Sequence, residues 1–137
     1  MAKIVNALRC LLLAGAALMA SGAANAAELG TRASSMGGVT VKVTPKSVEP
    51  GAAAWEFAVV LDTHSQDLSD DLMKNSVLVD AQGVRHAPLA WEGSPAGGHH
   101  RSGALRFKGL ATLPEAIELQ MRRPGEPAPR SFRWKLK

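Results

Sequence analysis

The chain has 137 residues, of which 46% are hydrophobic, 20% charged and 4% aromatic. This length argues for one domain, and the composition excludes a disordered or a fibrous protein. The 16 basic residues outnumber the 12 acidic residues, which gives a formal net charge of +4 at pH 7.

The first 26 residues have the pattern of a secretory signal peptide. Lys3 and Arg9 form a basic start, residues 10–20 are apolar and rich in Leu and Ala, and the sequence Ala-Asn-Ala at residues 24–26 is a cleavage signal. The apolar stretch is shorter than the ~20 residues that a membrane-spanning helix needs. We therefore expect a periplasmic or secreted protein that begins at Ala27 and has no transmembrane segment.

Cysteine usage narrows the chemistry of the exported chain. Cys10 is the only cysteine, and it lies within the expected signal peptide. The exported chain would then have no thiol and no disulfide, which excludes a thiol nucleophile, a blue-copper thiolate and a Cys-ligated zinc site. The fold must also be stable on its hydrophobic core alone.

The mature chain starts with a segment of small and polar residues, 27–38, which we interpret as a flexible leader. Apolar and polar residues then alternate in 39–44, 55–61 and 131–137, as they do in strands with one buried face. We expect 55–61 to be a central strand. The residues predicted to point inward in the last two segments are Trp55, Phe57, Val59, Leu61, Phe132, Trp134 and Leu136.

Other segments complete the expected domain, residues 39–137. The i,i+4 spacing of Leu68 and Leu72 predicts a helical turn within residues 65–73. A hairpin turn at residues 81–83 and an edge or bend at Pro88 follow from their turn residues. Further strands are expected at 76–80, 84–91, 104–108 and 115–122, with a glycine-rich loop at 93–103. About seven strands with at most one short helix indicate an all-β, Ig-like antiparallel β-sandwich.

Two stretches of histidines form a candidate metal site. Asp62 and His64 follow the central strand at positions i and i+2, so their side chains would point to the same side. His99 and His100 follow two glycines, which let a backbone approach closely. Imidazole and carboxylate ligands suit Zn²⁺, Cu²⁺ or Ni²⁺, so the expected site is His64, His99, His100 and Asp62 with zinc or copper as cofactor.

These residues also have ordinary structural explanations. Asp62 and Ser65 can cap the turn after the strand, His64 can make a hydrogen bond near that loop, and the Gly-Gly-His-His run can be a mobile surface loop. His86 is expected to be an ordinary surface or edge residue. The residues contain no P-loop, dinucleotide-binding or nucleophile-elbow motif, so we expect a non-enzymatic binding protein.

A second functional hypothesis comes from the distribution of charge. Residues 27–100 carry five cations and nine acids, whereas residues 101–137 carry nine cations and three acids. A basic sheet face in this last third would hold an anionic envelope component or a partner protein; a solvated outer face is the simpler alternative. Export and the few aromatic residues argue against nucleic acid. The cations of this expected face are Arg106, Lys108, Arg122, Arg133 and Lys135.

The order of these motifs also resembles a group of small exported prokaryotic proteins of unassigned function. The resemblance lies in the run from Leu61 to Leu68, in Trp91-Glu92-Gly93, in the run from Gly97 to Phe107 and in the final Phe132-Arg133-Trp134. It covers nearly all of the mature chain and implies no activity. It supports the hypothesis that the two histidine stretches belong to one feature.

Overall fold

The computed structural model describes residues 29–137. The expected signal peptide, its cleavage site and Cys10 lie outside these residues. Within the described part, no helix combines the length and the apolar character that crossing a membrane requires.

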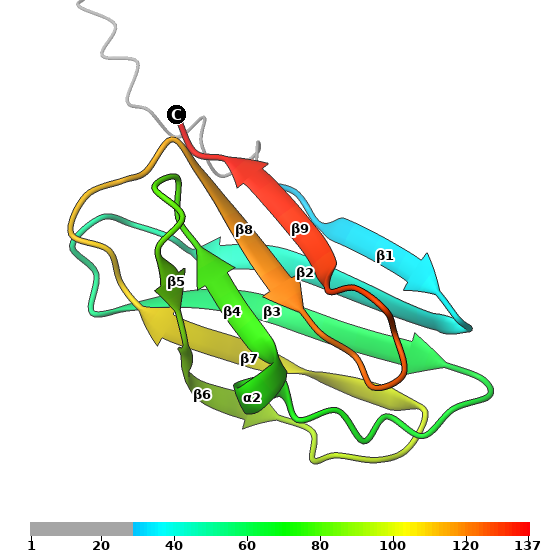
Figure 1. Ribbon diagram of the computed structural model, residues 1–137. Helices are drawn as coiled ribbons and strands as arrows, with labels where there is room; N and C mark the ends of the chain where they lie inside the picture. The colour runs from blue at the N-terminus through cyan, green and yellow to red at the C-terminus, as the bar shows by residue number, and fades with distance from the viewer. Residues whose placement is uncertain (1–28) are drawn as a thin grey trace, which may run out of the picture.

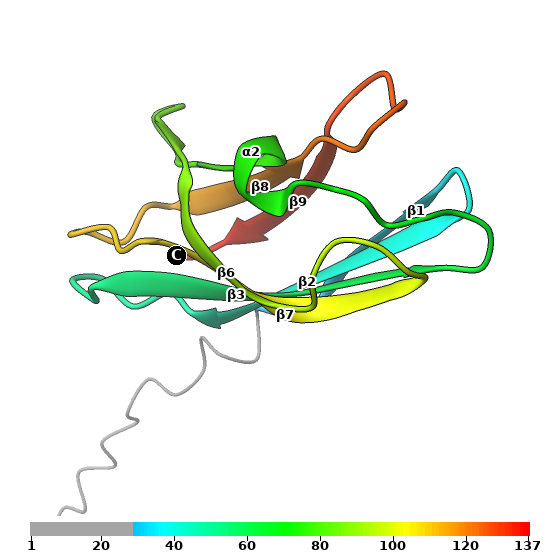
Figure 2. The same ribbon diagram turned by 90° about the horizontal axis from the view of Figure 1, so that it is seen from below.

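The protein is all-β, and two antiparallel sheets lie face to face (Figures 1 and 2). The five-stranded sheet has the order β1-β2-β3-β7-β6, and its strands are β1 (Arg32–Met36), β2 (Val39–Ser47), β3 (Ala54–Thr63), β7 (His100–Lys108) and β6 (Pro88–Gly93). The four-stranded sheet has the order β5-β4-β8-β9, and its strands are β5 (Arg85–His86), β4 (Ser76–Val79), β8 (Ala116–Met121) and β9 (Arg130–Lys135). The expected sandwich is confirmed, with two short strands more than predicted.

The strand order is that of an immunoglobulin-type sandwich. In that arrangement strands A, B, E and D form one sheet, and C, F and G form the other. Strands β2, β3, β7 and β6 occupy the first four places, and β4, β8 and β9 occupy the other three. Strand β5 extends the second sheet beside β4, and β1 extends the first sheet beside β2.

The core between the sheets consists of the residues that alternation predicted. All seven side chains predicted to point inward from residues 55–61 and 131–137 are buried. Phe57 packs edge-to-face on Phe107, with ring centroids 5.7 Å apart, and lies 5.8 Å from the Trp134 ring. These rings from both sheets form the centre of the sandwich, so period-two alternation specified the buried faces.

Residues 27–38 are not simply a flexible leader, because Arg32–Met36 form strand β1. This strand pairs with β2 along its whole length, from Arg32 opposite Val43 to Met36 opposite Val39. Gly37 and Gly38 connect the two strands with φ values of +58° and +78°. Both central residues of a type I′ hairpin turn need positive φ, which glycine adopts without a steric cost. The β domain therefore begins before residue 39.

The short helix lies later than predicted. Helix α2 spans Leu72–Asn75, and the Asp71 side chain caps it by accepting a hydrogen bond from the Lys74 backbone N–H. Leu68 is buried, but it lies in the segment before the helix. Leu72 is also buried, so both leucines belong to the core, but they do not share the helical turn that their spacing predicted.

The expected return strand 84–91 is divided between the two sheets. Strand β5 pairs with β4 in one sheet, whereas β6 pairs with β7 in the other, and Ala87 lies between them. Figure 2 shows the chain crossing from one layer to the other at this point. Pro88 has no backbone N–H to donate, which fits its position at the start of an edge strand.

The expected glycine-rich loop is shorter than residues 93–103. Strand β7 begins at His100 and pairs with β3, so Gly103 lies opposite Val59 within a regular ladder. A Cβ atom at Gly103 would lie only 2.6 Å from the Gly93 Cα atom of β6. The two glycines thus allow the β6 and β7 backbones to approach closely, rather than providing loop flexibility.

Candidate functional site

The structure brings together two of the four predicted metal ligands. Asp62 at the end of β3 and His100 at the start of β7 are cross-strand partners. The His100 Nδ1 atom and the Asp62 Oδ1 atom form a hydrogen bond, and both side chains are about half exposed. This contact leaves the His100 Nε2 atom as the ring nitrogen that is free for another interaction.

The other two predicted ligands do not complete a site. His64 and His99 are exposed, and His99 contributes its backbone oxygen to a 2.9 Å hydrogen bond from the Thr63 N–H. Among residues 29–137, no three His, Cys, Asp or Glu side chains group closely enough to hold a metal ion. The metal site therefore stays a prediction, and the structure supplies only its Asp62 and His100 pair.

His86 has a defined structural partner. Its Nε2 atom lies 3.1 Å from the Asp80 Oδ2 atom. The Asp80 Oδ1 atom accepts hydrogen bonds from the backbone N–H groups of Gln82 and Val84, at 2.9 and 3.0 Å. Burial opposes ionisation of Asp80, but the hydrogen bond with His86 and those from the two backbone groups outweigh it and hold the pKa of Asp80 below the ordinary value. His86 thus fastens the predicted hairpin turn.

The five cations predicted to form one basic face lie on two different sheets. Arg106 and Lys108 belong to β7 in the five-stranded sheet, whereas Arg133 and Lys135 belong to β9 and Arg122 follows β8 in the four-stranded sheet. The prediction of a single basic face was therefore wrong. The sequence shows an excess of basic residues in the last third of the chain. It does not show that β7 pairs with β3 in the five-stranded sheet, away from β8 and β9.

Arg106 is also neutralised by its neighbours. Its Nη2 atom lies 3.2 Å from a carboxylate oxygen of Glu56 and 3.4 Å from one of Glu92. Glu56 is the cross-strand partner of Arg106 on β3. Paired charges of this kind on a sheet surface attract an external anion weakly, because two carboxylates already surround the guanidinium.

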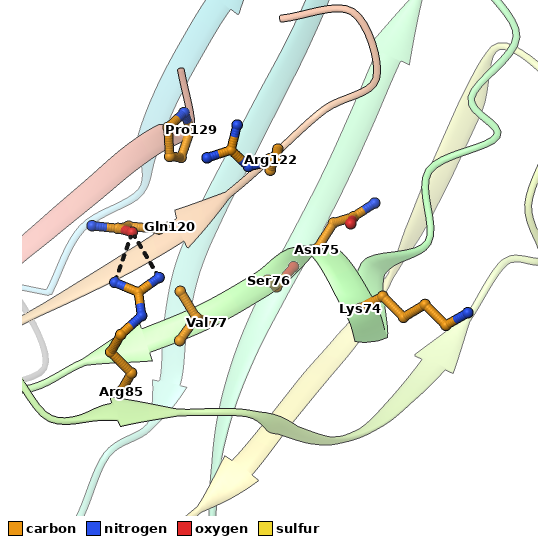
Figure 3. A pocket seen from close by; sticks show the side chains of 8 residues that line it. All are labelled: Lys74, Asn75, Ser76, Val77, Arg85, Gln120, Arg122 and Pro129. Atoms are coloured by element: carbon orange, nitrogen blue, oxygen red, sulfur yellow. Dashed lines mark hydrogen bonds between the residues drawn. The ribbon is translucent and has the colours of Figure 1, made fainter. Parts of the chain in front are cut away.

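A small pocket on the four-stranded sheet collects cations from separate parts of the chain. It has a volume of about 160 Å³ and contains three basic side chains: Lys74 in α2, Arg85 in β5 and Arg122 after β8 (Figure 3). Among the described residues that line it, none is acidic. The remaining lining residues are Asn75, Ser76, Val77, Gln120 and Pro129.

Hydrogen bonds hold two of the three cations beside this pocket. The Arg85 Nη1 and Nη2 atoms both lie 3.4 Å from the Gln120 Oε1 atom, which is a long contact for each (Figure 3). The Arg122 backbone N–H donates to the Asn75 backbone oxygen at 2.8 Å, which joins the end of β8 to the end of α2. The pocket is therefore formed by the pairing of β4 with β5 and β8.

Lys74 and Arg122 are exposed, whereas Arg123, the next residue in the chain, is buried. The Lys74 side chain is 84% exposed, and its nearest carboxylate, that of Asp71, lies 4.0 Å away and outside the pocket lining. Arg122 is exposed, and its side chain has no ion pair with the described residues. Arg123 is only 4% exposed. Adjacent residues at the end of β8 thus point to opposite sides, as strand geometry requires.

Arg123, the residue after Arg122, forms a buried ion pair. Its Nε and Nη2 atoms donate to the two carboxylate oxygens of Asp70, at 2.7 and 3.0 Å. Burial opposes the charged guanidinium, but the hydrogen bonds and the charge of Asp70 outweigh it and raise the pKa of Arg123. This bidentate pair fixes the segment before α2 against the end of β8.

Arg130 connects the same region to the β1–β2 hairpin. Its guanidinium donates to the backbone oxygens of Ser34, Met36 and Val39 at 2.8 to 2.9 Å. It also donates to both carboxylate oxygens of Glu126, at 2.9 and 2.7 Å. Hydrogen bonds from Arg130 hold the pKa of Glu126 below its ordinary value.

The signal for these buried arginines was absent from the sequence analysis. Arg101, Arg123 and Arg130 are all less than 5% exposed, although arginine is mostly a surface residue. Acceptors that are distant in the chain explain their burial. Arg101 donates to the backbone oxygens of Leu68 and Asp70, which are 33 and 31 residues away, and Arg123 donates to Asp70, which is 53 residues away. No family model, curated protein or solved structure matches this chain.

Proposed function

We propose that this protein is an exported, non-enzymatic binding protein that holds an anionic envelope polymer on the outer face of its four-stranded sheet. The observation that supports this proposal is the pocket of Lys74, Arg85 and Arg122, whose lining residues include no acid in the described chain. Cations that gather without a carboxylate repel one another, so an anion at this position lowers the electrostatic energy.

Basic residues also outnumber acidic residues on the sheet surface around the pocket. Arg133 and Lys135 add two exposed cations on the same face, and Glu118 is the acid between them and the pocket. The Glu118 carboxylate accepts a hydrogen bond from the Ser131 hydroxyl and lies 3.5 Å from the Arg133 Nη2 atom. The bond from Ser131 contributes most to holding the pKa of Glu118 below its ordinary value. This acid is therefore engaged along β9, and Arg85 and Arg122 have no ion pair among the described residues, whereas Lys74 lies 4.0 Å from the Asp71 carboxylate.

The polar character of the pocket favours charge as the source of affinity. Only Val77 and Pro129 among its lining residues are apolar. Binding would then weaken with salt, because ions screen exposed charges over about 8 Å at physiological ionic strength. A polymer that repeats its negative charge along a chain fits a pocket flanked by further cations.

Retention on immobilised heparin, a sulfated polysaccharide, tests this proposal. The mature protein should be retained at low salt and released as salt rises. An Arg122→Ala, Lys135→Ala double variant should elute at clearly lower salt. The control is Lys42→Ala with Lys108→Ala, which removes two exposed cations from the other sheet and keeps the same net charge as the test variant. Equal shifts for both variants would show attraction by net charge alone and would contradict a dedicated face.

A second candidate function is transition-metal binding, which the Asp62 and His100 contact supports. A carboxylate bonded to one ring nitrogen orients a histidine so that the other nitrogen can bind a metal. Zn²⁺ should then raise the melting temperature of the wild type and not of His100→Ala, while His86→Ala should respond as the wild type does. A melting temperature that Zn²⁺ leaves unchanged in the wild type would overturn this candidate.

A further inference from the structure

We propose that β1 is an interaction surface to which a second copy of this chain adds its own β1 as an antiparallel strand. An edge strand has unpaired backbone N–H and C=O groups that can bond to the strand of another chain. The five-stranded sheet would then continue across a two-fold axis into the partner. This inference goes beyond the proposed function and does not depend on it, because strand pairing requires no anion.

Three of the four edge strands have features that prevent such pairing. Strand β5 has only two residues. Strand β6 begins with Pro88 and has an irregular register between Pro88 and Ala90. Strand β9 carries the exposed cations Arg133 and Lys135, and the Arg133 backbone oxygen already accepts a 3.1 Å hydrogen bond from the Arg32 Nε atom. Short length, proline, bulges and charge all protect a sheet edge from another chain.

Strand β1 lacks most of these features. It pairs with β2 in a regular register, contains no proline, and has Arg32 as its single charged residue. Ser34 is half-buried, and the other residues of the strand are exposed. Among residues 29–137, no strand pairs with the outer edge of β1, which ends the five-stranded sheet (Figure 1). This edge is therefore the one most open to another strand.

The hairpin turn determines which backbone groups of β1 face outward. Met36 and Val39 flank the two-glycine turn and are register partners, so they form the hydrogen-bonded pair that closes the turn. Hydrogen-bonded and non-hydrogen-bonded pairs alternate along an antiparallel ladder. Ser34 therefore also bonds to β2, whereas the N–H and C=O groups of Ala33 and Ser35 point away from the sheet.

The ladder on the other side of β2 gives the same assignment. The Thr63 N–H donates to the His99 oxygen at 2.9 Å, and these residues flank the pair of Asp62 and His100. Such a bond marks the flanked pair as non-hydrogen-bonded, so the Asp62 backbone groups face β2 and bond to its register partner, Thr40. The residues on either side of Thr40 consequently face β1, as the turn also requires.

A two-fold axis beside Ser34 makes the outward groups of two copies match. Two antiparallel β1 strands centred on this residue place Ala33 opposite the partner's Ser35, and Ser35 opposite the partner's Ala33. Both residues have outward groups, so each pair exchanges two hydrogen bonds and the interface gains four. Arg32 lies opposite the partner's Met36, so no like charges lie directly opposite each other.

Sedimentation equilibrium of the protein that begins at Ala27, in buffer without any polymer, tests the inference. We expect a monomer–dimer equilibrium with a Kd on the order of 1 mM, because one short strand pair buries little surface. Ala33→Pro removes the outward N–H without removing a bond to β2, so it should raise the Kd at least about tenfold. Ala33→Val keeps this N–H and is the matched control with an unchanged Kd. The melting temperature of each variant shows that it is folded.

Single cysteines test the register, since residues 27–137 contain no cysteine. Ser34→Cys would place two thiols directly opposite each other in a non-hydrogen-bonded pair, with Cα atoms about 4.5 Å apart, which suits a disulfide. Ser35→Cys is the matched control, because the two copies of this residue would be diagonal neighbours roughly 7 to 8 Å apart. Ser34→Cys should form the covalent dimer about tenfold faster, although Ser35 is the more exposed residue.

The outcomes are distinct from those of the heparin experiment. A wild type that stays monomeric well above the expected Kd would overturn the inference, whether or not the protein is retained on heparin. Oxidation of Ser35→Cys as fast as that of Ser34→Cys would indicate random collision and would overturn the two-fold pairing. A dimer that Ala33→Pro leaves unchanged would place the contact elsewhere and would overturn the inference as well. A dimer without heparin retention would support the strand pairing and contradict only the proposed function.

Discussion

Arg122 and Arg123 are neighbours in the chain, yet they belong to two regions with opposite uses of charge. Arg123 lies in a buried cluster in which it bonds to both carboxylate oxygens of Asp70 and lies 3.4 Å from Glu126. Arg122 lies on the surface beside two other cations, and the lining of that pocket contains no acid among the described residues. Because successive residues of a strand point to opposite sides, Arg122 lies on the surface, where it can contact a partner, and Arg123 lies inside, where it stabilises the fold.

The difference shows which charges are available to a partner. In the buried cluster each guanidinium has carboxylate or carbonyl acceptors, so an external anion would have to displace them. In the pocket an anion competes only with the two long contacts from Arg85 to Gln120 and with the Asp71 carboxylate near Lys74. Counting basic residues along the last third of the chain therefore overstates the number that can bind an anion.

The largest expected effect is on the buried cluster. Asp70→Asn should lower the free energy of unfolding by about 3 to 5 kcal/mol, because it leaves the buried Arg123 without its bidentate partner. Urea unfolding with an unchanged m-value would measure the loss. Asp71→Asn is the matched control, since Asn caps a helix about as well as Asp. A similar loss in both variants would show that the cost comes from the segment and not from the buried charge.

A smaller effect should follow from the pH dependence of the same cluster. The pKa of Glu126 is lowered in the folded state, chiefly by its bonds to Arg130. Its stabilising contribution is therefore complete above the unfolded value of about 4.3 and is lost as pH falls through the lower folded pKa. Unfolding free energies of the wild type and Glu126→Gln should be separated at pH 7 and converge below about pH 4. Parallel curves over this range would contradict the role of the Glu126 carboxylate.

The core and the sandwich could be predicted because their signal is local. In residues 55–61 every second side chain is large and apolar, and alternation alone assigns Trp55 and Phe57 to one face. Strand β1 gave no such signal, since Ala33, Ser34 and Ser35 have little preference for strands. It forms because two glycines fold it back on β2 and because Arg130 bonds to its backbone oxygens.

The candidate site could be predicted only in part, because its residues meet through strand pairing. Four ligands were expected to meet, and the strand register brings two of them together by placing Asp62 opposite His100. The lining of the pocket includes Lys74, Arg85 and Arg122, of which only Arg122 was among the predicted cations. No local pattern indicates that β4 lies between β5 and β8, so it is the sheet topology that brings residues of α2, β5 and β8 to one pocket.

The smallest expected effect completes the comparison of the two neighbouring arginines. Arg122→Ala should change the free energy of unfolding by less than about 0.5 kcal/mol, because its exposed side chain makes no hydrogen bond or ion pair with the described residues. Removing a cation from beside Lys74 and Arg85 relieves repulsion, so the change should be neutral or slightly stabilising at low salt. Urea unfolding at low and at high salt would measure it. If Arg122→Ala destabilised the domain by several kcal/mol at both salt concentrations, this side chain would be a structural element like Arg123, and the division between a buried cluster for stability and an exposed pocket for binding would be wrong.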